Sequence, residues 1–205
     1  MVFSKTLQNT IVQLSLLIIL AFVLQMFAAS QGLMEKCFVL QTPLVEHPWT
    51  AVTAVFAHSG INHLTSNLTG LILFGIPVAY KASKLKFYLF FTITGSLVGI
   101  SQVLTSYYMY NLGIGSEPVG VVGASGAIFA VIGYFITSNR VSNYTSNLIP
   151  IPNKIRYLLY IAVATWITFA TASPQAALIG HFTGLLIGLV AGKANILKDS
   201  TNSVK

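Results

Sequence analysis

Long uncharged runs of apolar residues, separated by short charged segments, constrain this chain more than any other feature. The first run, residues 6–34, contains no charged residue and has its apolar centre at 11–29. A helix needs about 20 apolar residues to cross the hydrocarbon core of a bilayer. Only 7% of all residues are charged, against about 25% in a soluble domain. The sequence therefore predicts a membrane protein and excludes a soluble enzyme, a disordered tail and a disulfide scaffold.

Six such runs can be placed along the chain. The second ends in a basic patch of three lysines, and Pro174 separates the last two because its ring breaks a helix. We predict an all-α membrane protein whose residues 1–205 form a single domain of six transmembrane helices. The expected spans are 11–29, 61–80, 87–107, 123–139, 155–171 and 175–192.

The basic residues predict the orientation of these spans. An even number of spans places both termini on one side, and ten of the eleven Lys and Arg residues then fall on that side, with Lys36 alone on the other. Basic residues are concentrated in cytoplasmic loops. We therefore expect both termini to be short cytoplasmic tails, with Glu35, Glu46 and Glu117 outside.

The fourth run is too short to cross a bilayer as a helix. Its helical part, 126–138, has 13 residues, or about 20 Å, whereas the hydrocarbon core is about 30 Å thick. Gly123 and Gly126 flank Ser125, and glycine extends a helix poorly. We expect this helix to begin inside the membrane, after a loop at 108–122 that enters from outside. Such backbone is tolerated only beside protein or water, so a wet cavity open to the exterior is implied.

The spans contain no Asp, Glu, Lys or Arg, which makes their remaining polar residues informative. His63 and Asn67 lie in the second span, Ser125 opens the fourth, and His181 lies in the sixth. Counted from the cytoplasmic basic residues, Asn67, Ser125 and His181 lie about 18–22 Å deep, and His63 lies one turn further out. The four side chains are thus expected at a similar level in the outer half of the bilayer.

These four side chains suit serine hydrolysis. A serine hydroxyl becomes nucleophilic when an adjacent base takes its proton, and His181 is the available base. Because no span carries a carboxylate, a hydrolase would use a Ser-His dyad rather than a triad. Backbone N–H groups at the start of the fourth helix, with His63 and Asn67 on one face of the second, could stabilise an oxyanion.

Smaller features would support this site, although each has a plainer reading. Phe129 lies one turn after Ser125 and could stack on His181. Glycines at 184, 188 and 192 form a stripe that permits close helix approach. Alternatively, Ser125 caps its helix, His63 bonds a neighbouring helix, and the glycines serve packing alone.

Three motifs resemble those of the rhomboid family of intramembrane serine proteases. They are HSGINHLTSN at 58–67, GASG at 123–126, and HFTG at 181–184 followed by Gly188, within a match that covers about 49–192. The resemblance implies Ser125 as nucleophile, His181 as general base, and His63 and Asn67 as oxyanion-stabilising residues. It also implies supporting positions at Gly123, Gly126, Phe129 and Gly184, and neither a cofactor nor a metal.

The resemblance further implies cleavage of peptide bonds in or near transmembrane segments. The partners would be transmembrane protein substrates and the lipid bilayer, not nucleic acid. The expected location is a prokaryotic cell membrane, with the active site facing the exterior. Two positions depart from the pattern of many members: Thr50 follows Trp49 where Arg is common, and Phe129 replaces Tyr. Neither change removes a catalytic group.

Two other functions remain open from the sequence. A non-catalytic protein of this fold could bind client helices without cutting them, and a small transporter could line a polar path with the two histidines and Asn67. Missing intramembrane carboxylates and missing internal repeats argue against transport. For a protease, we expect the substrate to enter between the second and fifth spans, past a loop at 173–179, with Trp166 and Phe169 as candidate gate residues.

Overall fold

The structure is a computed structural model that describes residues 5–138, 141, 152, 154–155, 158, 162 and 174–198. Within these residues the regular structure is helical, and two isolated β-bridges occur without a strand. This agrees with the predicted all-α class. The helices are α1 (Lys5–Ser30), α2 (Met34–Phe38), α3 (Thr50–Thr53), α4 (Ile61–Lys81), α5 (Lys84–Asn111), α6 (Ser125–Thr137) and α9 (Pro174–Lys193).

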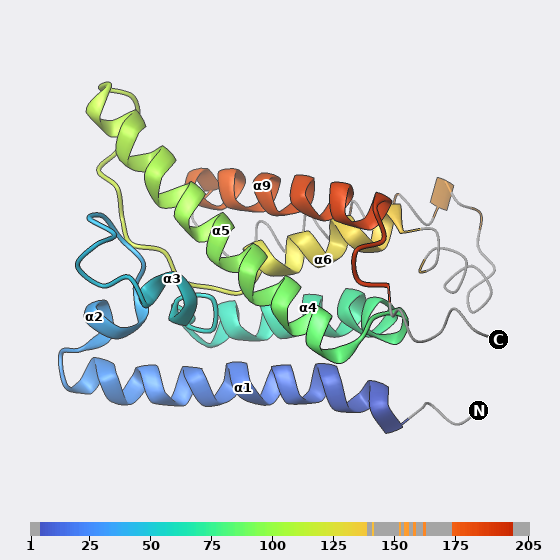
Figure 1. The fold of residues 1–205 in the computed structure, drawn as a ribbon. Helices are drawn as coiled ribbons and strands as arrows, with labels where there is room; N and C mark the ends of the chain where they lie inside the picture. Colours follow the sequence, from blue (N-terminus) through green and yellow to red (C-terminus); the bar gives the residue numbers. More distant parts are fainter. Residues whose placement is uncertain are drawn as a thin grey trace.

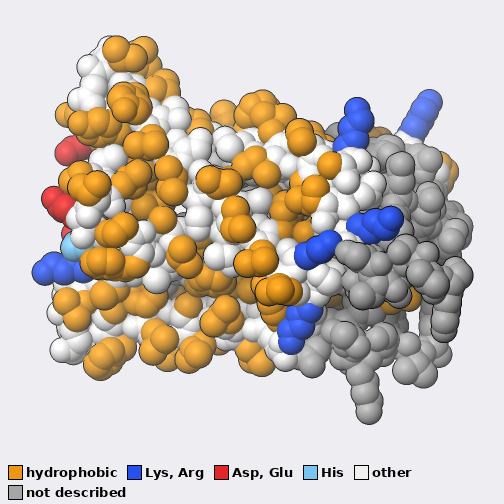
Figure 2. Space-filling view, in the orientation of Figure 1, with side chains coloured by type: hydrophobic (Ala, Val, Ile, Leu, Met, Phe, Trp, Pro, Cys, Tyr) orange, Lys and Arg blue, Asp and Glu red, His pale blue; other side chains and the backbone are white. Residues whose placement is uncertain are grey.

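The first helix shows how the long helices divide their surfaces. Ile11, Leu14 and Ile18 are buried at helical spacing, facing α4, where Gly75 lies against Ile11. The opposite side is apolar and exposed, as Leu16 and Phe27 illustrate. Figure 2 shows hydrophobic side chains covering much of the visible surface between the two ends of the molecule. A helix that is apolar on both faces suits a lipid environment.

Helix α6 is the core of the bundle. Ten of its 13 residues are buried. Its Phe135 meets Phe74 of α4 edge-to-face at 5.5 Å, and its Tyr134 meets Phe90 of α5 at 5.9 Å between ring centroids. In Figure 1, α5 crosses the bundle obliquely and α6 begins part-way along the length of the molecule. The predicted short fourth helix is therefore surrounded by its neighbours.

Glycines let α6 and α9 touch along their backbones. A side chain on Gly184 would collide with the carbonyl of Gly126, one on Gly188 with that of Ala130, and one on Gly192 with that of Tyr134. Each step of four residues along α9 matches four along α6, so the two helices run parallel. This confirms the predicted close approach, and it holds the start of α6 beside the middle of α9.

The predicted helices are present at 11–29, 61–80, 87–107 and 175–192, and the helix predicted at 126–138 is observed at Ser125–Thr137. The predicted loops at 108–122 and 173–179 were too long. Helix α5 continues to Asn111, and α9 begins at Pro174, since proline suits the first turn of a helix. Most of the fifth span, including Trp166 and Phe169, lies outside the described residues, and its described positions 155, 158 and 162 are helical.

Within the part of the chain that the structure describes, two helical stretches are long and apolar enough to cross a membrane, Thr10–Ser30 and Lys84–Asn111. Ser125–Thr137 and Leu178–Lys193 are shorter apolar helices. The basic side chains visible in Figure 2 gather mainly at the end where α4 and α9 finish, and acidic side chains appear at the opposite end. This separation of charge supports the expected orientation, which stays a prediction, as does the count of six spans.

Candidate active site

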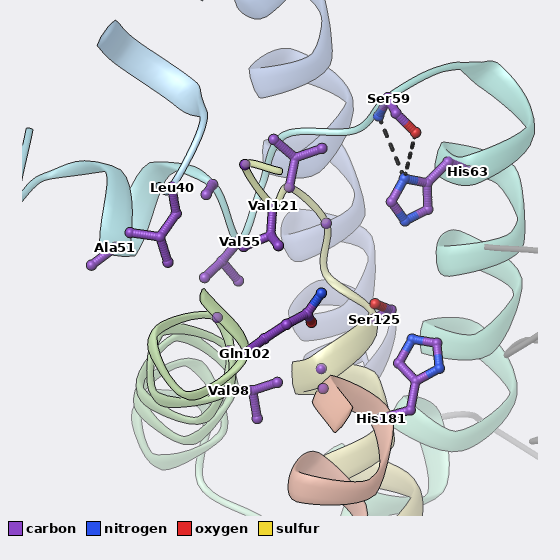
Figure 3. Close-up of a pocket in the computed structure, with 18 of the residues that line it drawn as sticks. Leu40, Ala51, Val55, Ser59, His63, Val98, Gln102, Val121, Ser125 and His181 are labelled. Atoms are coloured by element: carbon purple, nitrogen blue, oxygen red, sulfur yellow. Dashed lines mark hydrogen bonds between the residues drawn. The ribbon is translucent and has the colours of Figure 1, made fainter. Parts of the chain in front are cut away.

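A cavity of about 210 Å³ lies where α3, α4, α5, α6 and α9 meet. Ser125, His63 and His181 all line it, from three different helices (Figure 3). These residues are separated by up to 118 positions in the sequence, and the fold brings them together. The depth of each residue in the bilayer, estimated from the sequence, could not show that the three side chains are neighbours.

Ser125 is the first residue of α6. The N-cap residue is Ala124, and no side chain caps the helix, so the alternative in which Ser125 is the cap is wrong. The first N–H groups of a helix have no acceptor within it. Ser125 thus presents its hydroxyl beside uncapped N–H groups at a helix N-terminus, where the helix dipole favours negative charge.

The segment before α6 is held in place by the rest of the fold. Val121 and Leu40 exchange two backbone hydrogen bonds of 2.9 and 3.1 Å, and the Gly123 N–H donates to the Ala54 carbonyl at 2.8 Å. Gly123 has φ +131°, a conformation that favours glycine. These bonds pair some of the backbone N–H and carbonyl groups of the non-helical segment, and they fix the position at which α6 begins.

Gly123 also packs directly against His63. A Cβ at this position would lie 2.7 Å from His63 Cε1 and 2.8 Å from Nε2. Both the backbone conformation and the space around it therefore require glycine. The contact brings the imidazole edge of His63 to the backbone two residues before Ser125.

His181 lies on α9 and is 4% exposed. Its ring stacks on Phe129 of α6 with centroids 4.2 Å apart and an interplanar angle of 9°, as predicted. Figure 3 shows the imidazole beside the Ser125 side chain. The stacking restricts rotation of the His181 ring. Phe129 lies one turn after Ser125 on α6, so the same contact holds the ring near Ser125. This arrangement can place a base next to the hydroxyl.

His63 and Asn67 lie on one face of α4, as their spacing indicates. Asn67 is 0% exposed, and neither its Oδ1 nor its Nδ2 has a hydrogen-bond partner among the described residues. His63 Nε2 is likewise buried without a partner there. An unpaired buried polar group costs about 1–3 kcal/mol. These three unpaired atoms lie close to the segment before Ser125. A site that stabilises a transient negative charge needs polar groups that are free to bind it.

Sequence reasoning missed Gln25, which contacts the loop that contains His58. His58 is 0% exposed and structures the loop before α4. Its backbone N–H donates to Gln25 Oε1 at 2.7 Å, and its carbonyl accepts from Gln25 Nε2. Gln25 lies seven residues after Ile18 on the buried stripe of α1. A polar residue at a buried position of an otherwise apolar helix was the sequence signal that could have identified Gln25.

The His58 side chain is edge-to-face with His63, with ring centroids 4.9 Å apart. Burial, and secondarily the neighbouring His63, lower the pKa of His58 to about 3. His58 therefore stays neutral at physiological pH. It adds no positive charge next to His63.

Gln102 of α5 is a second residue that sequence reasoning missed. It lines the cavity, and Figure 3 shows its side chain extending toward Ser125. Its position inside an apolar run was the available signal. Among the described residues, none that lines the cavity is Asp, Glu or Cys, and no group of three or more His, Cys, Asp or Glu could hold a metal ion.

Comparison with known families identifies the fold. The model of the rhomboid domain matches residues 45–197. The chain belongs to the rhomboid family. Members of this family are integral membrane proteins, which agrees with the apolar exposed helices. Residues 58–67, 123–126 and 181–184, on which the sequence resemblance rests, all lie within the match.

Three relatives illustrate the similarity. RHOMBOID-like protein 1 of Arabidopsis thaliana is 27% identical over 161 residues, covering 77% of this chain and 39% of its own length. RHOMBOID-like protein 6, mitochondrial, also from Arabidopsis thaliana, is 27% identical over 144 residues, covering 70% and 42%. Human Rhomboid-related protein 3 is 25% identical over 177 residues, covering 75% and 39%. The chain spans about two fifths of the length of these relatives. Because these three relatives are eukaryotic, they give no support to the expected prokaryotic membrane.

Proposed function

We propose that this rhomboid is an intramembrane serine endopeptidase that cleaves peptide bonds in or near transmembrane segments of other membrane proteins. The observation that carries the proposal is the shared cavity. Ser125 opens α6 there without a side-chain cap, and His181 is stacked on Phe129 beside it. An adjacent base activates a serine nucleophile for acyl transfer, and the helix N-terminus favours the negative charge that develops.

In the proposed reaction, the imidazole of His181 takes the proton from Ser125 Oγ as the oxygen attacks the substrate carbonyl carbon. The C–N bond of the resulting tetrahedral intermediate then breaks, and His181 gives its proton to the leaving nitrogen. Water next attacks the acyl-enzyme ester after losing a proton to His181. Ser125 recovers the proton as the new carboxyl terminus is released.

The oxyanion would be held by three kinds of donor. They are the backbone N–H of Ser125, the Nε2–H of His63 and the side-chain amide of Asn67. The two α4 side chains have buried polar atoms near Gly123 that lack a partner among the described residues, so they would gain one when negative charge develops. Donors of this kind stabilise the transition state more than the ground state.

We place this activity in a single membrane domain of six helices over 1–205, with both ends in the cytoplasm. The cavity is lined by α3 and by the segment around Leu40, which lie at the end of the bundle away from most of the lysines. The site would therefore open to the exterior. Its partners would be transmembrane substrates and the surrounding lipid.

The experiment is cleavage of a transmembrane test substrate by the protein reconstituted in liposomes. We expect cleavage by the wild-type protein and none by Ser125→Ala or His181→Ala. The matched control is Ser101→Ala, a serine of α5 outside the cavity lining. Cleavage by Ser125→Ala at the wild-type rate would refute the proposal. Tight binding of the substrate without cleavage by the wild-type protein would favour the client-binding function instead.

A further inference from the structure

Ser59, in the loop before α4, makes two contacts with one nitrogen of His63. Its hydroxyl lies 3.0 Å from His63 Nδ1, and its backbone N–H donates to the same atom at 3.4 Å. Figure 3 draws both contacts. Neither the sequence motifs nor the proposed chemistry assigns a role to this serine.

The backbone contact determines which nitrogen of His63 carries the proton. A peptide N–H can only donate, so Nδ1 must be the acceptor. An imidazolium donates from both nitrogens, so the ring is neutral in this arrangement. A neutral imidazole has one N–H, which must then be on Nε2. The Ser59 hydroxyl adds a second donor to the same acceptor.

The protonated Nε2 faces the part of the cavity where chemistry is proposed. It is buried, it has no partner among the described residues, and it lies against Gly123, two residues before Ser125. Only the Nε2–H tautomer can donate a hydrogen bond there. The other tautomer would direct a lone pair toward a developing oxyanion and repel it.

The position of Ser59 is itself fixed from α1. The side-chain amide of Gln25 pairs with both the N–H and the carbonyl of His58, the preceding residue. Gln25 is 5% exposed and lies within the first apolar helix. The loop that carries Ser59 is thus tied to the bundle rather than left to move independently.

From this geometry we propose that Ser59 is a positioning residue that holds His63 as the Nε2–H tautomer, with its donor directed into the cavity. The proposal rests on the proposed protease function, in which His63 stabilises the oxyanion. Ser59 does not touch the substrate and acts only through His63. Its removal should therefore lower kcat and leave KM nearly unchanged.

The first test compares Ser59→Ala with Ser59→Thr, which keeps the hydroxyl, in the liposome cleavage assay. Because the backbone N–H remains, one lost hydrogen bond should lower kcat about 2- to 10-fold in Ser59→Ala, and Ser59→Thr should restore most of that loss. Thr65→Ala is the matched control, since its exposed hydroxyl bonds only the Asn62 carbonyl on the same helix. An unchanged kcat in Ser59→Ala would overturn the proposal.

The second test repeats Ser59→Ala in a His63→Ala background. A residue that acts through His63 should have no further effect there. An equal loss in both backgrounds would show a general structural role and overturn the proposal.

A third measurement does not depend on activity. Imidazole ¹⁵N chemical shifts distinguish a protonated from an unprotonated nitrogen, and His63→Ala identifies the His63 signals among the four histidines. We expect a protonated Nε2 in the wild-type protein and a mixture of tautomers in Ser59→Ala. A protonated Nδ1 in the wild-type protein would overturn the proposal. If Ser125→Ala still cleaves, the protease function fails, while this measurement still decides the role of Ser59.

Discussion

At the scale of single residues, three buried polar atoms of the site, on His63 and Asn67, lack hydrogen-bond partners in the described structure. Buried polar groups are normally hydrogen-bonded, so three unpaired atoms on His63 and Asn67 need an explanation. Their place beside Gly123 offers one. The groups would be satisfied only when an oxyanion forms in front of Ser125.

This explanation predicts the kinetics of variants of these two residues. His63→Ala and Asn67→Ala should each lower kcat by about 10²-fold or more, because each removes a donor to the transition state. The Ser125 N–H would remain, so some activity should persist in each. Steady-state cleavage in liposomes measures the effect. Wild-type kcat in both variants would rule out an oxyanion role for α4.

Because the pKa of His58 is lowered in the folded protein, we expect the stability of the fold to depend on pH. Its folded pKa of about 3 lies below the usual 6.5, because burial disfavours the charged form. The unfolded chain therefore binds a proton that the folded chain does not over this interval. The contribution of His58 to stability should be complete above pH 6.5 and be lost as the pH falls toward 3.

The matched variant His58→Gln cannot titrate but keeps the backbone pair with Gln25. Thermal unfolding in detergent should show a steeper fall of Tm between pH 6.5 and 4 for the wild-type protein than for His58→Gln. Equal slopes would show that His58 is not the group responsible. The comparison cancels the titration of residues common to both proteins.

At the scale of elements, the contact of α6 with α9 positions the two proposed catalytic residues. The stripe Gly184, Gly188 and Gly192 lies against backbone atoms of α6, so this contact cannot adjust by side-chain movement. Ser125 and His181 are held on opposite sides of it. Small residues let helix backbones approach closely in membranes.

Gly188→Val should therefore disrupt this packing. The added side chain would collide with the Ala130 backbone, and overpacking of this kind costs about 1–3 kcal/mol or more. We expect Tm in detergent to fall by several degrees and cleavage to weaken. Leu186→Val is the control, since Leu186 is exposed on the same helix. An unaltered Tm in Gly188→Val would contradict the observed helix contact.

The helices show which parts of the fold could be predicted from the sequence. Apolar runs predicted five helices within a few residues, and the short 126–138 run predicted that α6 begins part-way through the bundle. The end of α5 was misplaced because Tyr108 and Tyr110 follow a span without a breaking residue. Residues 107–111 are exposed, so the helix continues there without the buried apolar stripe that a hydrophobic pattern reports.

The site was predicted in part for the same reason. Polar residues stand out in an apolar span, so Ser125, His63, Asn67 and His181 could be selected by type and depth. Ser59 lies in a loop where serine is ordinary, and its contact with His63 depends on how Gln25 holds that loop from α1. Contacts between segments distant in sequence leave no periodic signal.

At the scale of the whole molecule, the low content of charged residues is consistent with both the membrane fold and the proposed function. The described spans are largely apolar on their outer faces and keep His63, Asn67 and His181 buried, around a cavity at the end away from most of the lysines. A cavity of this kind can hold water and a serine-histidine pair within a lipid-facing bundle. Membership of the rhomboid family agrees with this arrangement.

The central claim is that His181 activates Ser125 as a nucleophile. The most direct test is to treat the reconstituted protein with a fluorophosphonate, which modifies activated serines, and to locate the adduct by mass spectrometry. We predict one adduct on Ser125 in the wild-type protein and its loss in both Ser125→Ala and His181→Ala. Labelling that persists unchanged in Ser125→Ala, or a folded wild-type protein that cleaves its substrate without any adduct at Ser125, would contradict this account.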